Sequence, residues 1–139
     1  MLKVKILTIG KSKEAWLDEA LEEFYKRLRT QLQFEWVFAK DDAQLIQSCE
    51  KEGLVIAMDP LGKQLDSVEF SKYFLEKMET NGARLAFVIG GPEGLPKELR
   101  KGEMLSFSRM TFTHQIVRIV LVEQIYRALE IARGSPYHK

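Results

Sequence analysis

Two short segments with almost continuous apolar side chains constrain the fold of this chain most strongly. They are Gly53–Met58 (GLVIAM) and Ala83–Ile89 (ARLAFVI). A strand has this composition when helices cover both faces of its sheet. Between the two segments lies a helix signal, in which Asp66 or Ser67 caps a helix that reaches about Thr80. The order strand, helix, strand therefore predicts parallel strands joined by a crossover helix.

The rest of the chain continues this alternation of strands and helices. Further strands are expected at Leu2–Ile9, Leu32–Ala39 and Met104–Phe107. Further helices are expected from a cap at Ser12 to about Thr30, over Asp42–Glu52, briefly after Pro96, and over Gln115–Arg133. Asp59–Lys63 is expected to be a loop, because it is rich in turn-forming residues. The sequence thus predicts one α/β domain over residues 1–139, with a mostly parallel sheet and helices on both faces.

Composition limits the classes of function. The chain has 45% apolar and 29% charged residues, as is usual for a globular protein, and no apolar stretch approaches the roughly 20 residues of a membrane span. The single cysteine, Cys49, excludes an internal disulfide, and no metal-ligand spacing is present. We therefore expect a cytoplasmic protein without a metal. The net charge is only +1, but residues 95–139 carry eight Lys and Arg against four Glu, which favours contact with phosphates.

The last expected helix is apolar around most of its circumference. Its apolar residues are Ile119, Val120, Leu121, Val122, Ile125, Tyr126, Ala128, Leu129, Ile131 and Ala132. One sheet buries only one side of a helix, so the other side is expected to form an exposed apolar patch. A two-fold homodimer that packs through this helix would cover the patch.

A glycine-rich loop, Gly90–Gly94 (GGPEG), follows the Ala83–Ile89 strand. No serine-hydrolase elbow, P-loop or GxGxxG motif occurs in the chain. Open α/β sheets bind ligands beyond the carboxyl ends of their strands, where glycines let the backbone approach a ligand closely. The segments after Met58 and around Phe107–Phe112 are expected at the same edge. For the glycine loop taken alone, a tight connection without a ligand is the alternative.

Four segments of the chain resemble a known family. They are Ile89–Gly94 (IGGPEG), Leu105–Phe112 (LSFSRMTF) with His114 after it, Glu123–Ala128 (EQIYRA) and Pro136–Lys139 (PYHK). In these segments, and weakly over its whole length, the chain resembles the ribosomal large-subunit pseudouridine N3-methyltransferases (the RlmH family) of the SPOUT superfamily. The resemblance implies a C-terminal trefoil knot, a homodimer, and action on N3 of a pseudouridine in 23S rRNA of the assembled ribosome. A non-catalytic ribosome-binding or assembly factor that retains the pocket is the alternative.

The resemblance also implies the cofactor, S-adenosylmethionine. The residues that would bind it are Met58, Gly90, Phe107, Ser108, Arg109, Met110, Thr111 and Phe112. Backbone groups would hold the adenine, and apolar side chains such as Met58, Leu105 and Met110 would form walls around it. The family pattern usually has proline before the histidine, whereas Thr113 precedes His114 in this chain.

Methylation of a weakly acidic N3–H needs orientation of the reactants and a group that accepts the proton or stabilises the anion. The candidate catalytic residues are His138, His114, Arg118 and Tyr137. Either histidine is a candidate base, the arginine a candidate contact for an anion or phosphate, and the tyrosine a candidate stacking partner for a nucleobase. Asp59 is a further candidate, as a base or for the ammonium or ribose of the cofactor. A turn capped by Asp59 is the structural alternative.

Overall fold

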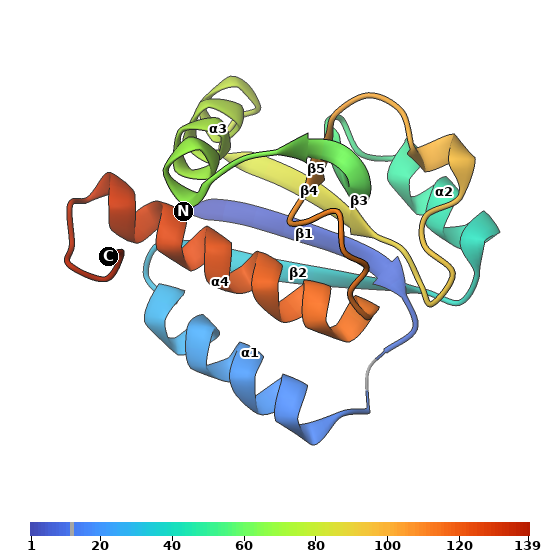
Figure 1. Ribbon diagram of the computed structural model, residues 1–139, viewed down its shortest axis with the longest axis horizontal. Helices are drawn as coiled ribbons and strands as arrows, with labels where there is room; N and C mark the ends of the chain where they lie inside the picture. Colours follow the sequence, from blue (N-terminus) through green and yellow to red (C-terminus); the bar gives the residue numbers. More distant parts are fainter. Residues whose placement is uncertain (12) are drawn as a thin grey trace.

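The computed structural model of the protein describes residues 1–11 and 13–139. Within them the chain forms a five-stranded sheet in the order β2-β1-β4-β3-β5, in which neighbouring strands are parallel. The strands are β1 (Leu2–Ile9), β2 (Leu32–Ala39), β3 (Val55–Gln64), β4 (Arg84–Ile89) and β5 (Met104–Ser106). The helices are α1 (Ala15–Leu28), α2 (Asp42–Glu50), α3 (Ser67–Thr80) and α4 (His114–Ala132), with a 3₁₀ helix, η1, at Lys97–Leu99. The predicted α/β fold with a parallel sheet is confirmed (Figure 1).

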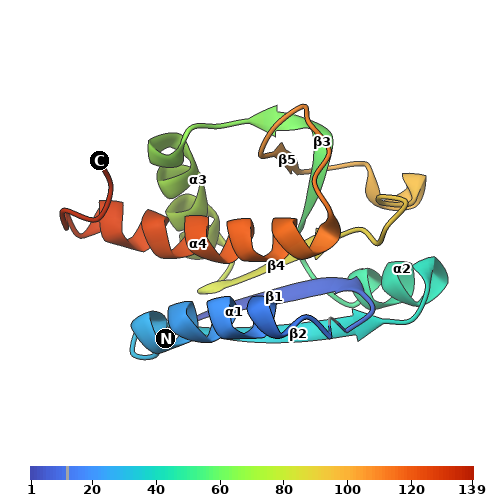
Figure 2. The ribbon, with the colours of Figure 1, turned by 60° about the horizontal axis from the view of Figure 1, so that its bottom comes forward.

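The helices are divided unequally between the two faces of the sheet. α1, α3 and α4 pack on one face, where Leu21, Phe74 and Ile125 join Phe87 of β4 in the core. α2 packs on the other face through Leu45. Figures 1 and 2 show α1 and α4 side by side, with α2 apart from them. Helices on both faces explain why the first part of β3 and the part of β4 after Arg84 are so apolar.

Most element boundaries agree with the sequence-based expectations to within two residues. The cap at Asp66 is confirmed, since its carboxylate accepts a hydrogen bond from the N–H of Glu69 at 2.7 Å. The expected cap at Ser12 lies outside the described residues. The expected loop at Asp59–Lys63 was wrong, because β3 continues to Gln64. Its turn-forming residues bend the strand instead of ending it.

This bend in β3 is the least regular part of the sheet. β5 pairs with Ala57–Met58 and then with Lys63–Gln64, and the register shifts between the two parts. A β-carbon on Gly62 would lie 2.6 Å from the backbone of Leu105, so a side chain at this position would prevent the two strands from passing so closely. Figure 2 shows the segment after β5 crossing β3 before it descends to α4. β3 therefore wraps around β5.

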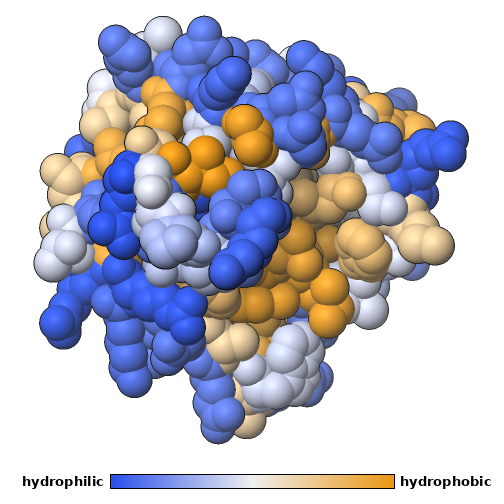
Figure 3. Space-filling view, turned by 60° about the vertical axis from the view of Figure 1, so that its left-hand side comes forward, coloured by the Kyte–Doolittle hydropathy of each residue, from blue (hydrophilic) through white to orange (hydrophobic). Residues whose placement is uncertain are grey.

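α4 is buried more completely than the sequence suggested. It contacts both α1 and α3 as well as the sheet, so Ile125, which is 0% exposed, and Leu129 belong to the core of the protomer. The expected apolar patch is reduced to the outward side, where Ile116 is 39% exposed and Ile119 and Val120 are half-buried. Figure 3 shows apolar groups exposed among polar ones on one side of the molecule. No described helix, α4 included, is long and apolar enough to cross a membrane.

Two substitutions on α4 test this difference in burial. Ile125→Ala is expected to lower the free energy of unfolding by about 2–5 kcal/mol, because it leaves a cavity in the core. Ile116→Ala, the matched control on the same helix, is expected to cost less than about 1 kcal/mol in the separate protomer, where Ile116 is 39% exposed. Urea denaturation followed by circular dichroism measures both costs, at a concentration where the protein is monomeric. An equal cost at the two positions under these conditions would contradict the burial described.

Candidate functional site

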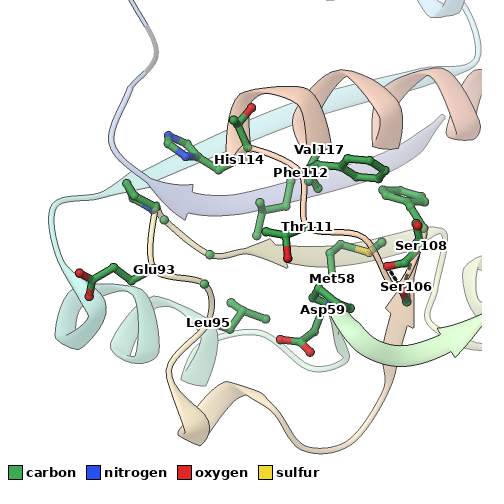
Figure 4. Close-up of a pocket in the computed structure, with 18 of the residues that line it drawn as sticks. Met58, Asp59, Glu93, Leu95, Ser106, Ser108, Thr111, Phe112, His114 and Val117 are labelled. Carbon is green, nitrogen blue, oxygen red and sulfur yellow. Dashed lines mark hydrogen bonds between the residues drawn. The ribbon is translucent and has the colours of Figure 1, made fainter.

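A cavity of about 500 Å³ lies at the carboxyl ends of the central strands. It is enclosed by Met58–Pro60 of β3, by the Ile89–Leu95 loop after β4, and by much of the segment that joins β5 to α4. Figure 4 shows side chains of these three segments around one hollow. The volume is typical of a small-molecule site. The three segments expected at this edge of the sheet therefore do converge.

Seven of the eight residues expected to bind a cofactor line this cavity. They are Met58, Gly90, Phe107, Ser108, Met110, Thr111 and Phe112. Arg109, the eighth, is exposed and does not line it. Binding of the cofactor by any of the eight stays a prediction. The first seven line the same cavity, whereas Arg109 does not contribute to its wall.

The glycine loop is a tight backbone turn. The N–H of Gly94 donates to the carbonyl of Gly91 at 3.0 Å, and Gly94 has a φ of +83°, which glycine adopts without strain. A β-carbon on Gly90 would lie 2.4 Å from the backbone carbon of Gly94. The loop itself therefore requires glycine at position 90. The loop is a tight connection and it lines the cavity, and its binding of a ligand stays a prediction.

Hydroxyl groups hold the segment between β5 and α4. Ser106 Oγ donates to the carbonyl of Ser108 at 2.8 Å, and Ser108 Oγ accepts from the N–H of Met110 at 3.0 Å. Thr113 caps α4, because its Oγ1 accepts from the N–H of Ile116 at 3.3 Å. Proline has no side-chain acceptor, so threonine in place of the usual proline adds a helix cap.

His114 and Arg118 lie one turn apart on α4, but only His114 lines the cavity. Burial lowers the pKa of His114 below its usual value, and the positive charge of Arg118 lowers it further. His114 is therefore neutral at neutral pH and is able to accept a proton. Arg118 is 2% exposed and donates to the carbonyls of Ile9 and Gly10 at 2.9 and 2.8 Å. It holds the end of β1, and its contact with a substrate anion stays a prediction.

The C-terminal tail packs against α4. Tyr137 Oη donates to a carboxylate oxygen of Glu123 at 2.7 Å. The Tyr137 ring lies edge-on to that of Tyr126, with centroids 4.8 Å apart. His138 Nδ1 lies 3.0 Å from a guanidinium nitrogen of Arg127. The polar, aromatic tail therefore has packing partners within its own protomer, which its sequence did not indicate.

The tail and the cavity do not meet in one protomer. An α-helix rises about 1.5 Å per residue, so Arg127, which contacts His138, lies roughly 20 Å along α4 from His114. The structure thus separates the four candidate catalytic residues into one at the cavity, one buried beside it, and two at the tail.

Asp59 lies in the cavity wall beside a cation that sequence reasoning missed. Its carboxylate accepts from the N–H of Leu61 at 2.9 Å and forms an ion pair with Nε of Arg100 at 3.3 Å. Asp59 thus makes the local hydrogen bond expected of a capping residue, although it does so within β3 and not in a turn. Arg100 follows η1 and belongs to no motif, so no sequence signal marked it. Among the described residues, no group of three or more His, Cys, Asp or Glu side chains is placed to hold a metal ion.

Comparison with known proteins agrees with this geometry. The family described as "Predicted SPOUT methyltransferase" matches residues 2–138. The chain belongs to the SPOUT methyltransferase family. A protein named ribosomal RNA large subunit methyltransferase H, from Protochlamydia amoebophila, is 51% identical over the full length of both chains. Proteins of the same name from Enterococcus faecalis and Carboxydothermus hydrogenoformans are 40% and 36% identical, and each match covers 99% of this chain and all of the relative.

Membership of the SPOUT family accounts for the unusual course of β3. The SPOUT fold contains a C-terminal knot, in which the last part of the chain threads through an earlier loop, so the knot implied by the sequence resemblance is confirmed with the family. Ordinary connection rules exclude such threading. β5 pairs with β3 in one register up to Met58 and in another from Lys63 onward, and the two strands pass each other closely at Gly62, between these two parts.

The requirement for glycine at position 90 is open to a direct test. Gly90→Ala is expected to lower the free energy of unfolding by about 1–3 kcal/mol, because its β-carbon overlaps the backbone of the same loop. Gly53→Ala is the control, since a β-carbon there has no atom within 4 Å, and it is expected to change stability by less than about 1 kcal/mol. Thermal denaturation compares the two. A Gly90→Ala protein as stable as the wild type would show that the loop has room for a side chain.

Proposed function

We propose that this protein is an S-adenosylmethionine-dependent methyltransferase that modifies N3 of a pseudouridine in 23S rRNA of the assembled ribosome. The observation that carries the proposal is the cavity at the knotted edge of a SPOUT chain. The full-length relatives named ribosomal RNA large subunit methyltransferase H support the ribosomal substrate. The pseudouridine and its N3 rest on the resemblance to that family. A ribosomal substrate implies a protein of the cytoplasm.

The cavity suits S-adenosylmethionine in shape and chemistry. Apolar side chains, among them Met58, Leu105 and Val117, offer walls to a flat purine ring. The glycines of the loop contribute backbone without side chains to the cavity wall, which lets a ligand approach the main chain closely. The buried carboxylate of Asp59 complements a ligand that carries a sulfonium and an ammonium group. When bound, this cofactor supplies the methyl group.

The protein's own residues orient the reactants and accept a proton. Transfer from a sulfonium to N3 is an in-line displacement, so holding the acceptor in line provides much of the rate enhancement. N3 must also lose its proton, and we assign its acceptance to His114, which lines the cavity and whose pKa is lowered by burial. His138 is the second candidate base, and its Nδ1 is held by Arg127.

We infer that a complete site needs two protomers. His138 and Tyr137 lie far from the cavity of their own protomer, while the outward side of α4 exposes Ile116. A two-fold dimer through this side of α4 would bring the tail of one protomer to the cavity of the other. Tyr137 would then offer a ring for stacking on the substrate base, and Lys139 a positive charge for phosphate.

Cofactor binding and methyl transfer test the proposed function. The purified protein is expected to bind S-adenosylmethionine in preference to ATP, as measured by calorimetry. It is expected to transfer radiolabelled methyl groups to ribosomes that lack this modification, with the label recovered in N3-methylpseudouridine after nucleoside analysis. Binding to ribosomes without incorporation would instead indicate a non-catalytic ribosome factor. Preference for ATP would indicate a nucleotide-binding regulatory domain.

The two-protomer site is tested by complementation. Deleting Tyr137–Lys139 is expected to lower methylation by roughly 100-fold or more, the usual size of a lost acid–base group. Thr111→Trp is expected to abolish methylation by filling the cavity. Mixed dimers of the two variants should regain activity, because one intact cavity then meets one intact tail. Verified mixed dimers without activity would contradict the shared site.

A further inference from the structure

Asp59 and Arg100 form a charged pair in the cavity wall, and the partner that Arg100 gives to the Asp59 carboxylate makes its role more specific. Asp59 is 6% exposed, and such a carboxylate is costly to bury unless it is paired. Its Oδ1 accepts from the N–H of Leu61, and its Oδ2 faces Nε of Arg100 at 3.3 Å. An ionised carboxylate offers about four acceptor positions. Asp59 therefore retains capacity for a further donor from the cavity that it lines.

Arg100 also has free hydrogen-bonding capacity. Its side chain is 40% exposed, and among the described residues Asp59 is the carboxylate with which it forms an ion pair. One of its terminal nitrogens would lie 3.4 Å from a β-carbon on Gly94, which places the guanidinium against the glycine loop. A guanidinium presents several donors in a fixed plane and suits a carboxylate ligand. Both members of the pair line the cavity.

We propose that Asp59 and Arg100 bind the amino-acid end of the cofactor, with Asp59 on its ammonium and Arg100 on its carboxylate. An α-amino acid carries its two opposite charges on groups attached to one carbon. An anion and a cation that are themselves neighbours can match both groups at once, and these two side chains are such neighbours. Figure 4 shows Asp59 next to Met58 and on the side of the cavity where Leu95 lies. This inference rests on the proposed function and assigns one part of the cofactor to named residues.

The charges of Asp59 and Arg100 neutralise each other, so neither charge is left unpaired in a poorly solvated place. A zwitterion adds one charge of each sign and keeps the balance. A ligand without the amino-acid end gains nothing from the pair, so the pair should discriminate S-adenosylmethionine from 5′-methylthioadenosine. These two ligands share the adenine, the ribose and the sulfur atom.

Calorimetric titration of the full-length protein with three ligands tests this assignment. The ligands are S-adenosylmethionine, S-adenosylhomocysteine and 5′-methylthioadenosine. Asp59→Asn keeps an acceptor for the N–H of Leu61 but removes the charge, and Arg100→Gln removes the guanidinium. Each variant is expected to bind the first two ligands roughly 10–100-fold more weakly, the loss of one charge-assisted hydrogen bond, and to bind 5′-methylthioadenosine as the wild type does. Lys101→Gln, which removes a neighbouring exposed cation outside the cavity, is expected to change none of the three affinities.

Other outcomes would overturn the assignment. An equal loss of affinity for all three ligands would mean that the pair only shapes the cavity. Unchanged affinities would mean that the amino-acid end lies elsewhere. A wild type that binds none of the three ligands would refute the proposed function itself, which is a different result. Arg100→Gln keeps the test open if Asp59→Asn does not fold, because Arg100 is the more exposed member of the pair.

Discussion

The close passage of β3 around β5 is the constraint on which the rest of this structure depends. It needs a position without a side chain, because a β-carbon on Gly62 would overlap the backbone of Leu105. The bend lets one strand pair with β5 twice, before and after the register shift. The bend in β3 also brings Met58–Pro60 next to the segment that joins β5 to α4. The cavity is therefore a product of the knot, since its walls come from segments that the threading holds together.

α4 connects the cavity to the tail and keeps them apart. Its first turn, capped by Thr113, places His114 in the cavity wall, and its later turns carry the residues that hold Tyr137 and His138. α1, α3 and the sheet hold this helix in place. The tail packs on its later turns, so it stays roughly 20 Å along the helix from His114. The division of the candidate residues between two places is thus a consequence of packing, and it is the reason to propose a site shared by two protomers.

The charges around the cavity are arranged in two different ways. Buried Arg118 donates its hydrogen bonds to main-chain carbonyls at the end of β1. Its positive charge lowers the pKa of His114 and so helps to keep that side chain neutral. Asp59 and Arg100 compensate each other while both retain hydrogen-bonding capacity. In the reaction proposed above, the base must be unprotonated, which suits His114, and the two opposite charges of the pair suit a zwitterionic ligand.

The amino-acid sequence by itself determined the order of strands and helices, the cap at Asp66, the convergence of loops at one edge of the sheet, and the family. Those features follow from short-range patterns: apolar runs, helical spacing, capping residues and contiguous motifs. Only the tertiary structure decided that Asp59–Lys63 continues a strand, that Ile125 lies in the core and not at an interface, and that the tail packs on Tyr126 and Glu123. It also decided that Arg100 meets Asp59. The physical reason is that each of these depends on which distant segments the threaded backbone brings into contact, and such contacts leave no periodic trace in the sequence.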